Sequence, residues 1–196
     1  TGSRTNVLGG STYLYTTNYY DDRSRLLQVQ NTNITGATDV LTTQYAFAGQ
    51  PVRAIRHTYK NGTNANDIME LTQYNYDSLS RLLTIQKQDI YSYNHVPVLN
   101  PNVTTVRYQY DALGRVAQKN LGNKPNGTSG TPLANQAHAY NIRGWLLSIN
   151  KAYVDASTNS DQYFGMELGY DKNASLGTFV PQYNGNIAGM LWKAEG

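Results

Sequence analysis

Residues 104–117 read TTVRYQYDALGRVA, and they contain the pattern that decides the fold. Apolar and polar residues alternate up to Tyr110, and apolar residues resume at Val116. A period of two is typical of a strand with one buried face. Between the two segments lies Asp-Ala-Leu-Gly, in which an aspartate can hydrogen-bond to the backbone two residues on and a glycine can adopt the left-handed conformation. The stretch therefore predicts a β-hairpin closed by a tight turn.

The same order of residues recurs along most of the chain. Close copies occupy residues 20–27 and 76–83, and looser copies begin at Tyr45, Tyr140 and Tyr183. The first five leading tyrosines lie 25, 31, 34 and 30 residues apart. A recurrent unit of this length predicts an array in which each hairpin buries a face against its neighbours. The positions that carry the pattern are Tyr20, Asp21, Arg25, Tyr45, Gly49, Tyr76, Asp77, Arg81, Tyr110, Asp111, Gly114, Arg115, Tyr140, Gly144, Tyr183 and Gly189.

We therefore expect an all-β chain in which about six tandem hairpins form a twisted antiparallel sheet strip with almost no helix. Gly114 and Gly144 are predicted to have a positive φ. Ser24 and Ser80 replace glycine at the same position, which implies either a strained serine or another type of turn.

The polar segments between the copies are expected to be longer hairpin loops at the opposite edge of the sheet. They are residues 31–36, 60–64, 120–132 and 155–161. No linker divides residues 1–196, so we expect a single segment. Because it opens on Thr-Gly-Ser, we expect that segment to be part of a longer protein.

The composition supports strands over helices. Tyrosine is frequent, with 17 Tyr against 3 Phe and 2 Trp, and its ring suits a half-buried sheet surface while its hydroxyl reaches water. Charged residues make up only 15% of the chain, below the roughly 25% of ordinary globular domains. Asn, Thr, Gln, Ser and Gly fill the polar positions instead, and these residues favour strands and turns.

Charge and hydropathy exclude several partners. The net charge is +3, and the arginines at 23, 25, 81, 115 and 143 are spread out, so we expect no nucleic-acid partner. No apolar run approaches the roughly 18 residues of a membrane span. The chain has no cysteine, which excludes disulfides and thiolate metal sites.

The residue types that carry catalysis are not arranged for it. His57, His95 and His138 lack metal-ligand spacing, and no nucleophile elbow, phosphate loop or dinucleotide fingerprint occurs. The turn aspartates recur at one position, which indicates a structural role rather than a unique catalyst. We expect no catalytic residue, no cofactor, no metal and no enzymatic activity.

The leading tyrosines have two interpretations. A row of exposed rings at Tyr20, Tyr76, Tyr110 and Tyr140 would stack on sugars. The same rings in fixed register would instead form a packed ladder across neighbouring hairpins, and the fixed register favours the ladder.

The Tyr-Asp-x-x-Gly-Arg-Leu pattern at this spacing resembles the YD-repeat or RHS-repeat family, over about residues 10–195. Segments 140–149, 163–166 and 183–193 look like the RHS proteins of Bacteroidetes-type bacteria. The resemblance implies a sheet strip that spirals into a hollow shell. In bacterial RHS toxins and insecticidal toxin complexes the shell encloses a toxic domain, and the related teneurins use it in adhesion. It also implies secretion or display on the bacterial surface.

The expected function is a non-catalytic structural segment of such a shell. Its expected partners are the rest of the parent protein, an enclosed effector domain, and other sheet edges through self-association. The alternative is a cell-surface binding module, an adhesin that recognises a glycan or a protein. A third interpretation, an enzyme acting on polysaccharide, lacks a unique pair of carboxylates.

Overall fold

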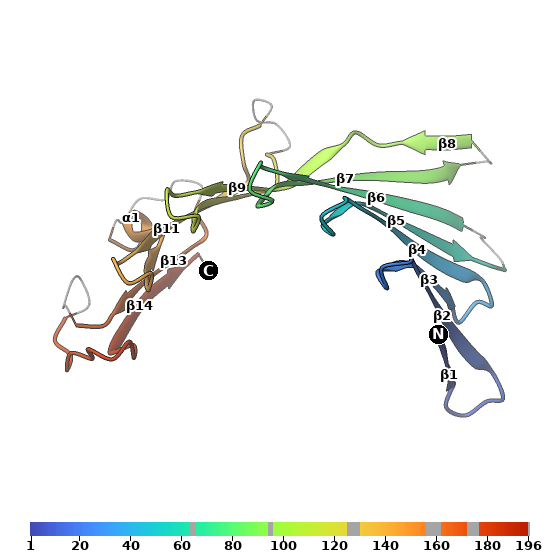
Figure 1. Ribbon diagram of the computed structural model, residues 1–196, viewed down its shortest axis with the longest axis horizontal. Coiled ribbons are helices and arrows are strands. Elements are labelled where there is room, and N and C mark those ends of the chain that lie inside the picture. Colours follow the sequence, from blue (N-terminus) through green and yellow to red (C-terminus); the bar gives the residue numbers. More distant parts are fainter. Residues whose placement is uncertain (63–65, 94–95, 125–129, 156–161, 172–176, 196) are drawn as a thin grey trace. The chain divides into compact units, whose positions relative to one another are not determined.

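The computed structural model of the chain describes residues 1–62, 66–93, 96–124, 130–155, 162–171 and 177–195. Strands account for 58% of these residues and helix for 3%, so the predicted all-β class and the near absence of helix are confirmed. The strands form one antiparallel sheet of 14 strands that is not closed. Strand order follows the chain from β1 to β7 and from β9 to β14, and β8 pairs with β7 off this path (Figure 1).

The contacts divide the chain into two compact units, Thr1–Thr104 and Thr105–Gly196. The first unit contains β1 (Gly2–Asn6), β2 (Tyr13–Tyr20), β3 (Leu26–Thr32), β4 (Thr38–Tyr45), β5 (Pro51–Lys60), β6 (Asn66–Tyr76), β7 (Leu82–Tyr93) and β8 (Val96–Leu99). Strand β9 (Val103–Tyr110) begins at the boundary. The second unit continues with β10 (Val116–Leu121), β11 (Ala134–Tyr140), β12 (Leu146–Ile149), α1 (Lys151–Asp155), β13 (Phe164–Gly169) and β14 (Gly189–Ala194).

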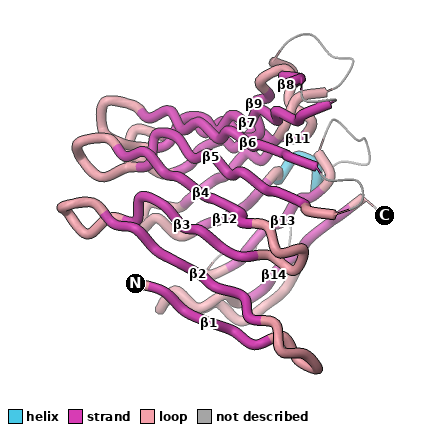
Figure 2. Tube along the Cα trace, turned by 90° about the vertical axis from the view of Figure 1, so that its right-hand side faces the viewer, coloured by secondary structure: helices cyan, strands magenta, loops and turns pink. Residues whose placement is uncertain are grey.

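Strands β1 to β7 of the first unit lie side by side in chain order (Figure 2). Alternation along β2 places Tyr13, Tyr15 and Tyr19 on one exposed face. On the neighbouring strand β3, Gln28 pairs with Tyr19 and Gln30 with Thr17, so both glutamines lie on the same face as these tyrosines. This face of the hairpin therefore combines aromatic rings with amide groups.

The segment 31–36 differs from the expected long loop. The N–H of Gly36 donates to the carbonyl of Asn33 (3.0 Å), and the N–H of Asn33 donates to the carbonyl of Ala37 (2.9 Å). Asn33 Oδ1 also accepts from the N–H of Thr35 at 3.0 Å. Asparagine therefore closes a tight turn at this edge as aspartate does at the other. The remaining expected loops lie partly outside the described residues, at 63–64, 125–129 and 156–161.

The second unit has a short helix against the sheet. Tyr153 of α1 is buried, and a Cβ added to Gly165 of β13 would lie only 2.8 Å from Val154 Cγ2. Glycine at position 165 therefore allows α1 to approach β13 closely.

A buried asparagine joins the strands where β12 ends. Asn150 has φ 48°, and its Nδ2 donates to the carbonyls of Asn135 and Phe164, each at 2.8 Å. Its Oδ1 accepts from the N–H of Ala137 at 2.8 Å. Asn150 follows the last residue of β12, and its side chain forms hydrogen bonds with the two strands on either side, β11 and β13.

Candidate functional site

Among the described residues, five tight turns follow a tyrosine at the end of a strand, and they share one backbone geometry, which the turn at Asn33 also has. At Asp111 the N–H of Gly114 donates to the Asp111 carbonyl (2.9 Å) and the N–H of Asp111 donates to the Arg115 carbonyl (2.8 Å). The register shifts at the tyrosine before each turn, as expected for a four-residue turn followed by a bulge. The same pair of bonds closes the turns that begin at Asp21, Ala46, Asp77 and Asn141.

The fourth residue of each turn is left-handed. Gly114 and Gly144 have φ of 80° and 82°, which confirms their predicted conformation. Ser24 and Ser80 have φ of 60° and 63°, so the turn type is kept and each serine carries the strain of a left-handed side chain. Gly49 has φ 97° at the equivalent place.

Three turns contain an aspartate that caps the backbone. Asp111 Oδ1 accepts from the N–H groups of Leu113 and Arg115, each at 2.9 Å, and Oδ2 accepts from Arg115 Nε at 2.7 Å. Asp21 and Asp77 make the equivalent bonds. The carboxylate therefore accepts three hydrogen bonds inside its own turn.

These bonds lower the pKa of the turn carboxyls. For Asp111 and Asp77 the largest influence is the N–H of the arginine four residues on, and the pKa lies below its ordinary value. For Asp21, burial would raise the pKa, but the bonds from the backbone and guanidinium of Arg25 outweigh it, so the pKa is again lowered. The aspartates are held as charged structural groups, unlike a proton-transferring acid.

A tyrosine hydroxyl connects several of these turns to the preceding hairpin. The hydroxyls of Tyr45, Tyr76 and Tyr140 donate to the carbonyls of Leu26 (3.0 Å), Pro51 (2.9 Å) and Val116 (3.0 Å). The acceptor in each case is the sixth residue after the preceding turn's tyrosine. We call this bond a tyrosine rung.

In the turns at Asp21 and Asp111, the arginine after the turn covers the ring of the next tyrosine. The guanidinium of Arg25 lies 5.1 Å from the centroid of the Tyr45 ring, and that of Arg115 lies 4.7 Å from the Tyr140 ring. Each guanidinium also donates to the carbonyl that follows that tyrosine, in Ala46 or Asn141. Arg81 pairs with Asp77 at 2.7 Å in its own turn.

Two expected positions lie outside this series. Tyr183 is 71% exposed, and Gly189 is the first residue of β14, paired with Gly169. Tyr170 makes the next rung instead, because its hydroxyl donates to the carbonyl of Leu146 at 2.9 Å. Its ring also packs on Trp145, with centroids 5.1 Å apart. The sequence signal for it was present in Tyr170-Asp171, which has the leading pair of the pattern.

Tyr20 and Tyr110 are the leading tyrosines of the other two turns. Tyr20 is half exposed, and its hydroxyl accepts from Thr1 Oγ1 at 3.3 Å. Tyr110 ends β9 and pairs with Val116 across the bulge.

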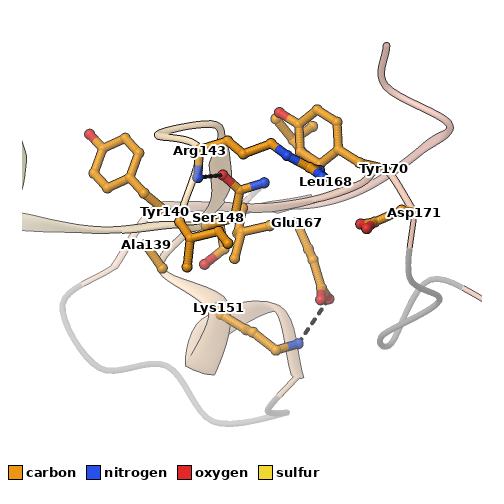
Figure 3. Close-up of a pocket in the computed structure, with 12 residues that line it drawn as sticks. Ala139, Tyr140, Arg143, Ser148, Lys151, Glu167, Leu168, Tyr170 and Asp171 are labelled. Carbon is orange, nitrogen blue, oxygen red and sulfur yellow. Dashed lines mark hydrogen bonds and ion pairs between the residues drawn. The ribbon is translucent and has the colours of Figure 1, made fainter. Parts of the chain in front are cut away.

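A groove of about 590 Å³ lies in the second unit, between the Asn141 turn, α1 and β13. Lys151 and Glu167 point toward each other there, with Nζ and Oε2 2.8 Å apart (Figure 3). The hydrogen bond to Glu167 is the largest influence that raises the pKa of Lys151, so the amine stays protonated. Sequence reasoning missed this pair, whose members are separated by 16 residues.

His57 and His138 lie in strands β5 and β11. His57 pairs with Asp67 on the neighbouring strand and packs against Tyr59, with ring centroids 3.9 Å apart and the rings tilted by 42°. Burial lowers the pKa of His138, and His95 lies outside the described residues. No group of three or more His, Cys, Asp or Glu that could hold a metal occurs in the described part of the chain.

A scan against models of known protein families finds no match, and a search of curated proteins finds no similar sequence. Within the described ranges, no helix has the length and apolar character needed to cross a membrane. Function is therefore inferred from the geometry of the chain itself.

Proposed function

We propose that the chain is a non-catalytic structural segment of a secreted or cell-surface RHS/YD-repeat protein, in which tandem hairpins build an encapsulating β-shell around a toxin or effector domain. The observation that carries this proposal is the tyrosine rung, which occurs with one geometry at Tyr45, Tyr76, Tyr140 and Tyr170. Each rung joins one hairpin to the next and is independent of the others. Such a bond extends an array, whereas a catalytic site would need residues that occur once.

The sheet edges support the same proposal. Among the described strands, the outermost ones, β1 and β14, each pair with one neighbour, so each presents a row of backbone groups along its outer edge. Met190, Leu191 and Trp192 of β14 are all exposed. Further hairpins of the same kind on either side would pair these edges and cover the apolar side chains.

Electron microscopy of the longest natural polypeptide that contains this sequence tests the proposal. We expect a hollow particle whose wall includes residues 1–196, and whose interior holds density for another domain. A solid particle, in which these strands form a separate closed domain, would contradict it.

A binding module is the second candidate function, and one specific observation favours it. Tyr13, Tyr15 and Tyr19 are 38%, 50% and 46% exposed on one face of β2, beside the amides of β3. Exposed rings beside amides suit a glycan or a protein surface. A glycan array or pull-down in which Tyr15→Ala and Tyr19→Ala abolish binding would favour this function. Tyr91→Ala is the matched control, because Tyr91 is an exposed tyrosine on the opposite face of the sheet.

A further inference from the structure

We propose that Asn184 is a site of spontaneous deamidation, at which the chain converts its own asparagine into aspartate and isoaspartate. The reaction needs water and no enzyme, and it does not depend on the structural role of the hairpins. Asn184 is exposed in the segment between β13 and β14, and the residue after it is Gly185. Two other asparagines of the chain make the same side-chain hydrogen bond and differ in the residue that follows.

The shared hydrogen bond folds the asparagine side chain back along the main chain. Oδ1 of Asn33, Asn141 and Asn184 accepts from the backbone N–H two residues further on, at 3.0, 2.9 and 3.1 Å. This bond holds the carboxamide over the peptide unit that follows the asparagine, with Cγ beside the nitrogen of the next residue. A nitrogen and a carbonyl carbon held close together react faster than free groups.

The residue after the asparagine decides whether that nitrogen can reach Cγ. Ile34 and Ile142 follow Asn33 and Asn141, and a β-branched side chain crowds the backbone nitrogen beside it. Gly185 has no Cβ and leaves its nitrogen accessible. In the part of the chain that the structure describes, the N–H of Gly185 has no hydrogen-bond partner, so no bond has to break before the attack.

Packing explains why a glycine occupies position 185. Gly185 has φ 94°, and a Cβ added to it would lie 3.0 Å from Cζ2 of Trp145. A larger residue would strain the backbone and displace the indole, which packs on Tyr170 with ring centroids 5.1 Å apart. The contact that anchors this segment to the sheet therefore requires the reactive Asn-Gly pair.

The reaction balances with water as the added reactant. The nitrogen of Gly185 attacks Cγ of Asn184, a C–N bond forms, and Nδ2 leaves as ammonia with the proton of the Gly185 N–H. Water then opens the cyclic imide. Cleavage of the bond from nitrogen to Cγ gives aspartate, and cleavage of the bond from nitrogen to the backbone carbonyl carbon gives isoaspartate. Both products carry a carboxylate in place of the neutral amide, and isoaspartate also lengthens the main chain beside Trp145.

The test is incubation of the full chain at neutral and mildly alkaline pH, followed by proteolysis and mass spectrometry of the peptides. We expect Asn184 to deamidate about tenfold faster or more than Asn33 and Asn141 in the same sample. The rate should rise with pH, because the attacking nitrogen must lose its proton. Peptide mapping separates Asn184 from Asn61 and Asn126, which also precede glycines.

Two variants remove or transfer the reaction. Asn184→Gln lengthens the side chain, so the cyclic intermediate would need a larger ring, and the mass gain in this peptide should stop. Ile142→Gly gives Asn141 the same next residue as Asn184, and it should leave the fold intact because Ile142 is 98% exposed. It should raise the deamidation rate of Asn141 about tenfold or more. Leu113→Gly is the matched control, since it changes another exposed turn residue and should leave Asn141 unaffected.

Any of three results would overturn the proposal. One is a deamidation rate of Asn184 that does not exceed the rates of Asn33 and Asn141 in the folded chain. Another is an unchanged rate of Asn141 in the folded Ile142→Gly variant. The third is a mass gain that persists in the same peptide of Asn184→Gln, which would assign the modification to Asn186.

Discussion

The turns at Asp111 and Asn141 have the same backbone geometry and different side-chain contacts. In both, Oδ1 of the first residue accepts from two backbone N–H groups, each at 2.9 Å. At Asp111 the fifth residue is Arg115, which pairs with the carboxylate and covers the ring of Tyr140. At Asn141 the fifth residue is Trp145, which packs on Tyr170. The shared part is therefore the Oδ1 cap, and the fifth residue covers the next tyrosine either as a cation or as an aromatic ring.

The turn at Ala46 has the backbone hydrogen bonds of the other turns but no side chain that caps them. The N–H of Ala46 donates to the Gln50 carbonyl at 2.8 Å, and that of Gly49 donates to Ala46 at 3.0 Å, as in the capped turns. No side-chain oxygen is available at position 46. The hydrogen-bonded turn thus forms without the cap, and the cap adds stability to a geometry that the left-handed fourth residue already permits.

The largest effect is expected at the last rung. Tyr170 is 6% exposed, so Tyr170→Ala should lower the free energy of unfolding by about 3–5 kcal/mol, as for other large-to-small aromatic changes. Tyr170→Phe keeps the ring, leaves the Leu146 carbonyl without its donor and should cost about 1 kcal/mol. Urea unfolding measures both.

Tyr183→Ala is the control for this prediction. Because Tyr183 lies at the surface, its loss should change stability by less than about 0.5 kcal/mol. A larger loss from Tyr183→Ala than from Tyr170→Ala would mean that the last rung has been assigned to the wrong tyrosine.

Substitutions at the first residue of a turn, which remove or add the capping side chain, should change the stability less than the loss of Tyr170. Asp111→Ala removes the acceptor of two N–H groups and the partner of Arg115, and should lower the urea midpoint clearly. Asp111→Asn keeps Oδ1 and reproduces the cap of Asn141, so it should lower the midpoint less. Ala46→Asp adds a cap to the uncapped turn and should raise the midpoint. Equal midpoints for Asp111→Ala and Asp111→Asn would show that Oδ1 does not cap the turn.

Substitutions at the fourth residue should change the stability less, and in opposite directions for turns with glycine and turns with serine at this position. Gly114→Ala places a Cβ at φ 80° and should cost about 1 kcal/mol. Ser24→Gly relieves a side chain at φ 60° and should stabilise the chain by up to about 1 kcal/mol. A neutral Gly114→Ala together with a destabilising Ser24→Gly would contradict the left-handed assignment. Both values come from the same unfolding experiment.

The smallest expected effect is on the pH dependence. The folded-state pKa of Asp111 is lowered, chiefly by the N–H of Arg115, so the folded chain binds this proton more weakly than the unfolded chain. The contribution is present above the unfolded pKa of about 3.9 and is lost as the pH falls through the folded value. Asp111→Asn should therefore flatten the acid limb of a stability–pH curve. An unchanged slope below pH of about 4 would contradict this assignment.

The turns could be predicted from sequence because their chemistry is local. Gly114 and Gly144 lie within four residues of the tyrosine and aspartate or asparagine that define the turn, so a short pattern was sufficient. The pair Tyr170-Asp171 signals the next leading tyrosine, but the acceptor of its rung depends on the pairing of β12 with β13, which a short pattern does not specify. Asn150 and the Lys151–Glu167 pair likewise depend on which strands are neighbours, and the sequence alone does not specify this.

The central claim, that these hairpins are part of a longer array, is tested most directly by sedimentation velocity of the purified chain at micromolar concentration. The outer edges of β1 and β14 and the exposed Met190, Leu191 and Trp192 should recruit other strands. We therefore expect self-association that increases with concentration. A stable monomer at every concentration, with a single sharp unfolding transition, would show that the sheet is complete in itself and would contradict the shell-segment account.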